Sequence, residues 1–493
     1  MLIKIEIPAF TLACIVLCAM LWSCSPSTSS SCGIVTGIIS LDGSPDHSGV
    51  IVSVYNAGVA PVNLRTIMDE YPQLAFPIDD KALFDHREHE ALHSVYTDNE
   101  GNFSFPKLPY DEYIVAYSKE GWGYNYLFDI ELNSDEMDIS ESLTPLHPEI
   151  LLPQYIDQQY ILEEGQCYRA VNDVVLSENS QLVIQSGSRL LLNNDVKLSI
   201  YGSLVTPSVG GKAHITSFSG IHSGTIPGSE KGEGMRLYVD NLQVGRLVLS
   251  HLSGALQVFG DGITSQNLLF HNNMFALRSV NASDITLNNC CFMNNLIETC
   301  PSAMIENGHN IAVSNNLFYG NEIALTYKLT LNSSVSNNAF IENNVGFANE
   351  WDSRTVLSNN VFTGNGTGVE NSGRSNLEIY LNEFKCSTGV KTYHANNAYN
   401  YPNNGWTIAN DNNFDCGSYA VKSLANYYGS EQPVHLDFTQ NFWGTNDQDQ
   451  IEQLIIDRND IGDLGGSGVT TEIDYLPFRS NPVSSAGILR VRH

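Results

Sequence analysis

The sequence predicts an all-β chain whose larger part is a parallel β-helix, in which the chain winds into stacked coils of short strands. Phenylalanine recurs at Phe270, Phe292, Phe318, Phe340, Phe362, Phe384, Phe414 and Phe442, with gaps of 22, 26, 22, 22, 22, 30 and 28 residues. Asparagine precedes most of these residues, as in Asn315-Asn316. One coil per repeat explains both features, because Phe can stack on Phe inside and asparagine suits left-handed bends and amide ladders. Propeller blades need about 40 residues or more, and leucine-rich repeats need a leucine framework, so the period favours the β-helix over both.

The start of the chain predicts export. Lys4 precedes an apolar run from Ile7 to Trp22, which is too short for a membrane span. The following Leu21-Trp22-Ser23-Cys24 resembles a bacterial lipobox, so residues 1–24 are expected to form a lipoprotein signal peptide with lipid on Cys24. Residues 25–32 would be a flexible tether. The resemblance implies a bacterial protein anchored to the outer membrane or cell surface; ordinary cleavage and an uncleaved anchor are the alternatives.

Residues 33–132 form a separate unit of strands. A turn at Asp98 to Gly101 leads into Phe103 and Phe105, which point to one face of a strand. The run from Thr97 to Leu108 and the opening run from Gly37 to Gly43 resemble the carboxypeptidase-regulatory-like domain, except over residues 56–94. That resemblance implies a small β-sandwich that serves as a non-catalytic spacer or binding module. Residues 133–160, with three prolines, are expected to be a linker.

The remaining chain resembles exported β-helix proteins of the pectate-lyase-like type. Short strands at tight spacing, such as Leu182-Val183-Ile184, match the first coils of such proteins, and Asn441-Phe442-Trp443-Gly444-Thr445 matches their closing run. The resemblance implies a right-handed parallel β-helix over residues 161–445 and a C-terminal cap over 446–482. Residues 449–458 would form an amphipathic helix over the open apolar end. The predicted fold is therefore a small β-sandwich followed by a right-handed parallel β-helix.

Charge and cysteine content restrict the partners. The chain has 54 Asp and Glu against 24 Lys and Arg, a net charge of −30, which repels phosphate backbones and excludes nucleic acid as an expected partner. Seven cysteines follow Cys24, and no CxxC pair is present, which disfavours a zinc site. We expect most of them to be small buried residues, with Cys386 and Cys416 as neighbours on adjacent coils.

The fold does not choose between binding and catalysis. Relatives of this kind include polysaccharide lyases, glycoside hydrolases, epimerases and adhesins. The NTD, GHG and RxK runs of polygalacturonase-type hydrolases are absent. The sequence therefore favours a surface-anchored, non-catalytic scaffold that binds polysaccharide or a surface glycan, or mediates adhesion, without a cofactor. The alternative is a β-helix polysaccharide lyase or glycoside hydrolase; a lyase would use Ca²⁺.

The candidate binding residues lie at one bend of successive coils. Counted from each phenylalanine, this bend holds Lys328, then Glu350 to Arg354, then Glu370 and Arg374. Aromatic rings stack on sugars, while carboxylates and amides bind hydroxyls. The expected ligand-binding residues are Trp351, Tyr393, Tyr399, Tyr401 and Trp406, and the candidate catalytic residues are Glu350, Asp352 and Arg354. The alternative is a set of solvated loops between coils.

A histidine cluster offers a candidate metal site. His86, His89 and His93 would share one face of a helix at i, i+3 and i+7. The alternative is a polar insertion on the sandwich.

The lipobox interpretation predicts that Cys24→Ser releases the protein from the membrane fraction, because the variant has no thiol to receive lipid. Cell fractionation followed by immunoblotting measures this, with Cys32→Ser as the matched control. Unchanged membrane association of the Cys24 variant would contradict the interpretation.

Overall fold

The computed structural model describes residues 31–74, 78, 80–208, 210–218, 231–296, 300–393, 405–424, 434–460 and 471–488. The chain divides into two compact units: Met1–Ala57, Ala91–Glu120 and Tyr124–Leu146 form unit 1, and Gly58–Glu90, Gly121–Gly123 and His147–His493 form unit 2. The predicted signal peptide and Cys24 lie outside the described residues. Within the described part of the chain, no helix is long and apolar enough to cross a membrane.

Unit 1 contains two small sheets. One joins β1 (Cys32–Ile38), β4 (Asn102–Ser104), β5 (Leu108–Pro109) and β8 (Glu136–Asp138), and the other joins β3 (His93–Tyr96), β2 (Ile51–Asn56), β6 (Asp111–Lys119) and β7 (Gly123–Leu132). Phe103 and Phe105 are buried, as expected for one face of a strand, and the turn before them closes when Gly101 N donates to Asp98 O. The two sheets support a small β-sandwich; its kinship with the carboxypeptidase-regulatory-like domain stays a prediction.

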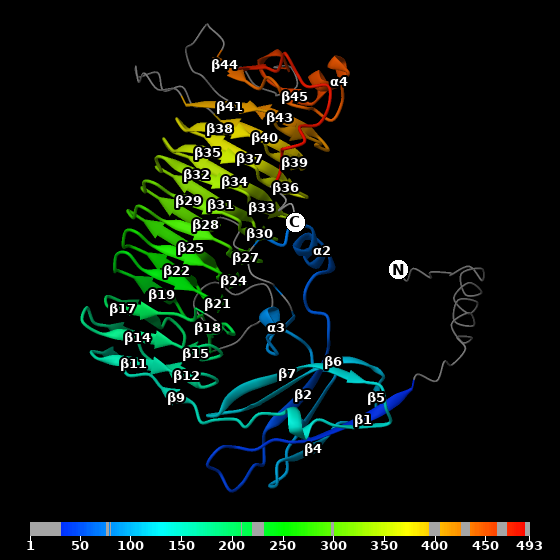
Figure 1. Cartoon of the computed structure of the whole chain (residues 1–493), viewed down its shortest axis with the longest axis vertical. Coiled ribbons are helices and arrows are strands. Elements are labelled where there is room, and N and C mark those ends of the chain that lie inside the picture. The colour runs from blue at the N-terminus through cyan, green and yellow to red at the C-terminus, as the bar shows by residue number, and fades with distance from the viewer. Residues whose placement is uncertain are drawn as a thin grey trace, which may run out of the picture. The chain divides into compact units, whose positions relative to one another are not determined.

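Unit 2 is a parallel β-helix of right-handed type, built from three walls of stacked strands (Figure 1). Sheet A contains β10 (Tyr155–Ile156), β13 (Val174–Leu176), β16 (Lys197–Ile200), β19 (Gly234–Leu237), β22 (Gly254–Val258), β25 (Phe275–Val280), β28 (Pro301–Glu306), β31 (Ile323–Lys328), β34 (Val345–Glu350), β37 (Thr367–Ser372), β40 (Thr388–Tyr393), β43 (Tyr419–Ser423) and β45 (Ile455–Ile456). Sheet B contains β9 (Ile150–Leu151), β12 (Cys167–Ala170), β15 (Arg189–Leu192), β18 (Ala213–Ser217), β21 (Leu247–Ser250), β24 (Leu269–His271), β27 (Cys291–Met293), β30 (Leu317–Tyr319), β33 (Ala339–Ile341), β36 (Val361–Thr363), β39 (Glu383–Lys385) and β42 (Asn413–Phe414).

The third wall is interrupted. It begins as β11 (Gln159–Leu162), β14 (Gln181–Ile184) and β17 (Ser203–Val205), and continues as sheet C, with β20 (Gln243–Gly245), β23 (Thr264–Gln266), β26 (Thr286–Asn288), β29 (Ala312–Ser314), β32 (Ser333–Ser336), β35 (Arg354–Ser358), β38 (Asn376–Tyr380) and β41 (Trp406–Asn410). The first coil starts at β9, inside the range 133–160 expected to be a linker.

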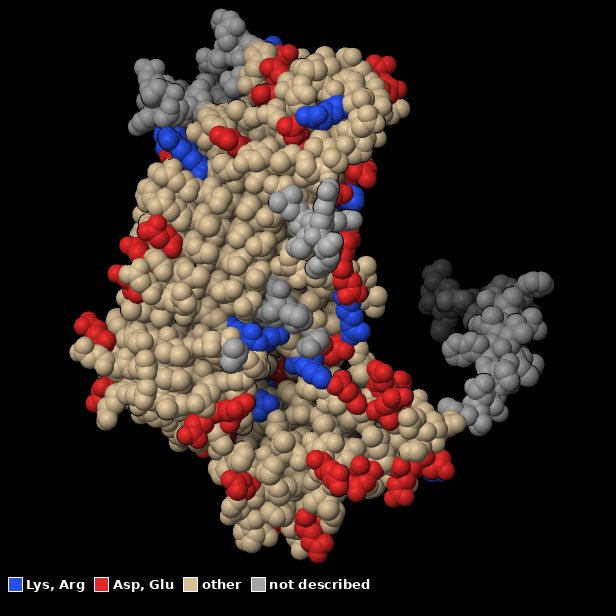
Figure 2. Space-filling model, viewed as in Figure 1, with Lys and Arg blue, Asp and Glu red and all other residues tan. Residues whose placement is uncertain are grey.

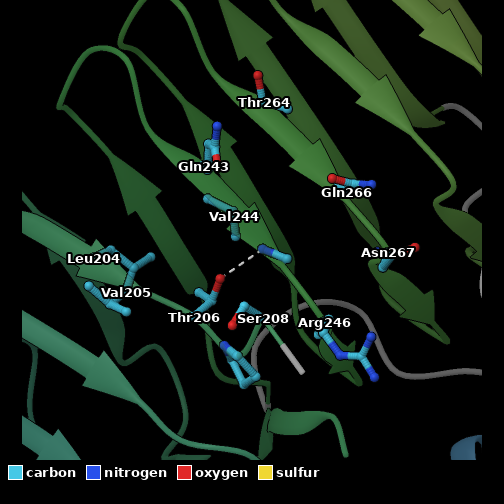
Figure 3. A pocket seen from close by; sticks show the side chains of 12 residues that line it. Leu204, Val205, Thr206, Ser208, Gln243, Val244, Arg246, Thr264, Gln266 and Asn267 are labelled. Carbon is cyan, nitrogen blue, oxygen red and sulfur yellow. Dashed lines mark hydrogen bonds between the residues drawn. The ribbon is translucent and has the colours of Figure 1, made fainter. Parts of the chain in front are cut away.

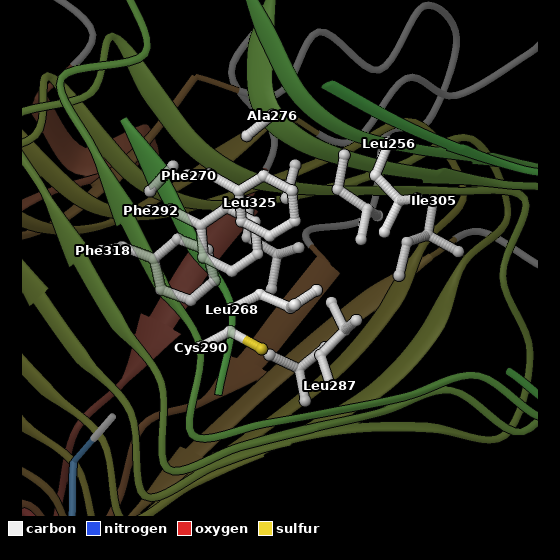
Figure 4. Close-up of a cluster of buried hydrophobic side chains, with 14 of the residues drawn as sticks. Leu256, Leu268, Phe270, Ala276, Leu287, Cys290, Phe292, Ile305, Phe318 and Leu325 are labelled. Atoms are coloured by element: carbon white, nitrogen blue, oxygen red, sulfur yellow. The ribbon is translucent and has the colours of Figure 1, made fainter. Parts of the chain in front are cut away.

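The predicted phenylalanine column is confirmed. Each ring from Phe270 to Phe414 stacks on the next, with centroids 4.7–5.0 Å apart and nearly parallel planes (Figure 4). All seven rings are fully buried. Because consecutive strands are held about 4.8 Å apart by their hydrogen bonds, the same side chain on each coil meets its copy face to face.

The last member of the column differs from the prediction. Trp443, and not Phe442, stacks on Phe414, with centroids 5.1 Å apart. Asn441 continues the asparagine ladder of the earlier coils, and in those coils the stacked ring comes two residues after the ladder asparagine. Since neighbouring residues of a strand point to opposite faces, the asparagine fixes the register and turns Phe442 outward.

Two asparagine ladders run through the bends beside the column. One consists of Asn316, Asn338, Asn360, Asn382, Asn412 and Asn441, and the other of Asn273, Asn295, Asn321, Asn343 and Asn365. After the first member of each ladder, the side-chain oxygen accepts from the backbone N–H and the side-chain amide of the asparagine on the preceding coil, as at Asn360, at 2.9 and 3.0 Å. The residue before each ladder asparagine has positive φ, as Asn337 and Asn359 do. In each pair of adjacent asparagines, the first therefore forms the left-handed bend, and the second forms the hydrogen bonds that join neighbouring coils.

A segment between β2 and β3 in sequence packs on the outer face of sheet B. This cover segment, residues 58–90, contains α2 (Val62–Glu70) and α3 (Asp80–Leu83), seen beside the strands of sheet B in Figure 1. Its apolar residues Ala60, Leu64, Tyr71, Leu74, Ile78, Ala82 and Leu83 share one core with Val248, Leu269, Cys291, Met293, Leu317, Tyr319, Ala339, Ile341, Val361 and Ile488. Sheet B is thus apolar and buried on both faces over these coils.

The far end of the β-helix is closed by the C-terminal residues. Helix α4 (Gln448–Gln453) is shorter than the helix expected over 449–458, because β45 follows it and adds a last strand to sheet A. Asp447 caps α4, and Ile451 is fully buried in the core of the β-helix. The strands β44 (Val434–Asp437) and β46 (Thr471–Asp474) pair beside this end.

Truncation of one ring of the column should destabilise the β-helix. Phe340→Ala leaves a cavity between Phe318 and Phe362 and should cost about 3–5 kcal/mol of unfolding free energy. Urea unfolding followed by far-UV circular dichroism measures the loss. Phe442→Ala is the matched control, because this ring is half-buried and lies outside the column, so it should cost much less. Equal losses from the two variants would contradict the column.

Candidate functional site

The charged bend predicted from the sequence lies along one edge of sheet A. The strand register places Lys328 beside Glu350, Glu370 beside Lys391, and Ser372 beside Tyr393. Lys391 Nζ lies 3.0 Å from Glu370 Oε1, and Lys328 Nζ lies 3.4 Å from Glu306 Oε1. Parallel coils therefore bring the bend residues of successive repeats side by side, as the period requires.

Trp351 is an exposed aromatic side chain at this bend. It is 63% exposed, and both Trp351 and Asp352 have positive φ, of 53° and 67°. Left-handed backbone costs a bulky residue roughly 1–2 kcal/mol. The Lys328 ammonium lies 5.7 Å from the centroid of the indole ring. The bend thus holds an aromatic ring in water at some cost in free energy, next to a cation.

The three candidate catalytic residues lie at separate places. Glu350 ends β34 in sheet A, whereas Arg354 is exposed and begins β35 in sheet C, opposite Asn376. Asp352 forms an ion pair with Arg374 of the next coil. Burial raises the pKa of Glu350; Lys328 opposes this rise and Glu370 adds to it.

The other candidate ligand-binding aromatics are described in part. Tyr393 ends β40 and is half-buried, with the Lys391 ammonium 4.8 Å from its ring centroid. Trp406 begins β41 and is half-buried beside Asn376, whose side chain accepts from Trp406 N at 3.3 Å. Tyr399 and Tyr401 lie outside the described residues.

A pocket of about 440 Å³ opens where the third wall is interrupted, between β17 and sheet C (Figure 3). Hydroxyl and amide side chains line it, among them Thr264, Gln266 and Asn267, with Arg246 at one side. Thr206 Oγ1 accepts from Gly245 N there at 2.9 Å. The hydroxyl and amide groups among its described lining residues suit a neutral, hydroxyl-rich ligand.

The charges are unevenly spread. In the view of Figure 2, acidic residues lie mainly along the margins, and a broad area between them carries neither acidic nor basic side chains. A neutral ligand can approach such an area despite the net charge of −30.

The predicted histidine cluster differs from the expectation. Residues 84–92 form turns and not a helix, so the helical face that the i, i+3, i+7 spacing requires is not formed. His93 is in β3 of unit 1 and is exposed, whereas His86 lies beside Asp85 and the His89 ring stacks on Phe84, with centroids 5.2 Å apart.

In place of that cluster, the cover segment brings Glu88 to two histidines of sheet B. Possible ligand atoms of Glu88, His251 and His271 all lie within 4.8 Å of one another. Burial lowers the pKa of His271 to about 4 and that of His251 well below its usual value, so both imidazoles are neutral at pH 7. Burial, followed by the charge of Asp85, raises the pKa of Glu88 to about 7.

The sequence alone did not reveal this group, because Glu88 is 163 or more residues away from either histidine along the chain. One signal was present. The residue after each phenylalanine points outward on sheet B, and it is His271 in the first coil but Met293, Tyr319 and Ile341 in the next three. A histidine at the start of this run of apolar outward residues marks a place where the surroundings change.

Comparison with known proteins gives one family match and several distant structural matches. Residues 220–432 match the family model described as periplasmic copper-binding protein (NosD). No curated protein matches the chain. Among solved structures, a mutant of the periplasmic alginate epimerase AlgG is 12% identical, with a TM-score of 0.43, covering 68% of this chain and 83% of that one. The A-module of the Azotobacter vinelandii mannuronan C-5 epimerase AlgE4 is 13% identical, with a TM-score of 0.36, covering 68% and 91%. An alginate lyase from Paenibacillus is 12% identical, with a TM-score of 0.27, covering 51% and 92%.

Proposed function

We propose that this protein is an exported, surface-anchored β-helix scaffold that binds glycan at the bend between sheets A and C, and that it does so without cleaving it. The observation that carries the proposal is Trp351. An exposed indole in left-handed backbone adds little to folding, and its free face can stack on a sugar ring.

The surroundings of Trp351 suit a sugar chain. Lys328, Glu350 and the Asp352–Arg374 pair offer donors and acceptors next to the ring. The spacing of the coils, about 4.8 Å, is close to the length of one sugar residue, so successive bends can contact successive sugars. Loops fixed on a rigid scaffold are a common place for such binding.

Export and anchoring rest on other features. The lipobox-like run ending at Cys24 supports a lipid anchor, and the periplasmic description of the similar NosD family supports export. That family is also described as copper-binding. Copper favours imidazole ligands, and the matched range contains the buried imidazoles of His251 and His271.

The alternative function is a polysaccharide lyase or glycoside hydrolase. Glu350 favours it, because a half-buried carboxyl with a raised pKa can act as a general acid or base. However, Asp352 is engaged in an ion pair with Arg374, and Arg354 lies in sheet C. This separation of the three candidate catalytic residues favours binding without catalysis.

The proposal predicts that Trp351→Gly weakens glycan binding without loss of stability. Glycine relieves the left-handed backbone, so the free energy of unfolding should stay level or rise by up to about 1 kcal/mol. Affinity electrophoresis through a panel of neutral and acidic polysaccharides measures binding, and product analysis of the same mixtures detects cleavage. Tyr96→Ala, an exposed aromatic of unit 1, is the matched control.

Retention of wild-type protein by at least one polysaccharide, lost in Trp351→Gly and kept in Tyr96→Ala, would support the proposal. Unchanged retention of Trp351→Gly would sink it. Cleavage products that disappear in Glu350→Gln would establish the enzymatic alternative.

A further inference from the structure

Two positions on the coils of sheet B hold histidine in one coil each, His271 and His251, whereas the other described coils have other residues there. In six successive coils the position after the sheet B strand is left-handed, and it holds His251, then Asn272, Asn294, Gly320, Glu342 and Gly364. The outward position on the strand holds Ser250, then His271 and Met293. Four of these six coils have asparagine or glycine at the bend, whereas His251 places an imidazole ring there.

The two histidines meet at the place where the cover segment crosses their coils. His251 N donates to His271 O at 3.2 Å, and the two rings are 5.8 Å apart and nearly perpendicular. Glu88 Oε1 lies 3.2 Å from His251 Nε2, and Asp85 Oδ2 lies 3.9 Å from the same atom. A carboxylate from the cover segment is therefore directed at imidazoles of the β-helix within unit 2.

One nitrogen of the buried His251 ring has no hydrogen-bond partner among the described residues. The residue is 3% exposed, and the nitrogen in question is Nε2. Glu88 takes a hydrogen bond from Asn272 Nδ2, which holds the carboxylate in place. A buried nitrogen without a partner is a cost that the surrounding hydrogen bonds do not offset.

We propose that Glu88, His251 and His271 bind one divalent transition-metal ion of the Zn²⁺ and Cu²⁺ class, which fastens the cover segment to sheet B. Metal bonds of about 2.0–2.1 Å in tetrahedral geometry separate ligand atoms by roughly 3.3 Å, close to the 3.2 Å between Glu88 Oε1 and His251 Nε2. Two imidazoles and one carboxylate leave a fourth position for water or a ligand atom.

The donor set selects against hard cations. Ca²⁺ takes six to eight oxygen ligands, whereas imidazole nitrogen suits Zn²⁺ and Cu²⁺. The two nearby cationic side chains have other partners. Arg87 forms an ion pair with Asp85, with Nη2 2.7 Å from Oδ2, and Lys231 Nζ donates to the backbone carbonyl of Asn272 at 3.4 Å. The proposal does not depend on glycan binding at Trp351.

The test is metal binding by the full chain in its folded state. Protein treated with chelator and then dialysed is titrated with Zn²⁺, Cu²⁺ or Ca²⁺, and bound metal is counted by mass spectrometry and calorimetry. His435, Glu472 and Asp474 form a second group that could hold an ion, so every variant is made in a His435→Ala background. Glu88→Gln, His251→Ala and His271→Ala test the site, and His309→Ala, an exposed histidine of a neighbouring coil, is the matched control.

We expect the His435→Ala and His309→Ala proteins to bind one equivalent of Zn²⁺ or Cu²⁺ and no Ca²⁺. The metal affinity of the three site variants should be at least about 100-fold lower, which exceeds the loss that follows substitution of residues around the ligands. Glu88→Gln conserves shape, so it keeps the test valid if a histidine variant fails to fold. The proposal is wrong if the His435→Ala protein binds neither ion, or if it binds one that Glu88→Gln and the histidine variants retain.

Discussion

Every feature of unit 2 depends on the alignment of one coil with the next, and the buried asparagine ladders enforce it. A ladder amide that shifted by one residue would leave its own donors and acceptors, and a backbone N–H of the preceding coil, without partners in the interior. The phenylalanine column adds apolar burial, but apolar contact alone tolerates sliding. Hydrogen bonding thus sets the register and stacking follows it, which explains why Trp443 displaces Phe442 at the last coil.

The same alignment determines what the outer faces can do. Because equivalent residues of successive coils are adjacent, a single kind of side chain repeated at one position becomes a continuous stripe. On sheet B the repeated outward residues are apolar and pack against the cover segment. At the edge of sheet A the stacked residues alternate in charge, as Lys328 and Glu350 do. At the bend after sheet A, Trp351 is exposed. The proposed binding sites lie where the sequence departs from the repeat.

The sequence predicted the parts that follow from periodicity. The coil length, the interior ring column and the neighbours at the bend, such as Lys328 beside Glu350, needed only the 22-residue spacing. The cover segment was out of reach, because nothing local connects Leu64 to Cys291. Yet strands such as Cys291-Phe292-Met293 and Leu317-Phe318-Tyr319 are apolar on both sides of the ring, which is typical of a sheet buried on both faces. The group of Glu88, His251 and His271 was missed for the same reason, since it forms only when the cover segment is in place.

The packing of the cover segment on sheet B is tested most directly by the reactivity of two adjacent cysteines. Cys290 lies in the interior core, whereas Cys291 lies on the outer face of sheet B beneath the cover segment, and both are fully buried. The measurement is alkylation of folded protein with iodoacetamide, with tandem mass spectrometry to assign the label to either thiol. The account predicts that neither thiol reacts in the wild-type protein, and that Leu64→Glu, which disrupts the packing of the cover segment, makes Cys291 reactive while Cys290 stays protected. Rapid labelling of Cys291 in the wild-type protein, or labelling of both thiols together in the variant, would contradict it.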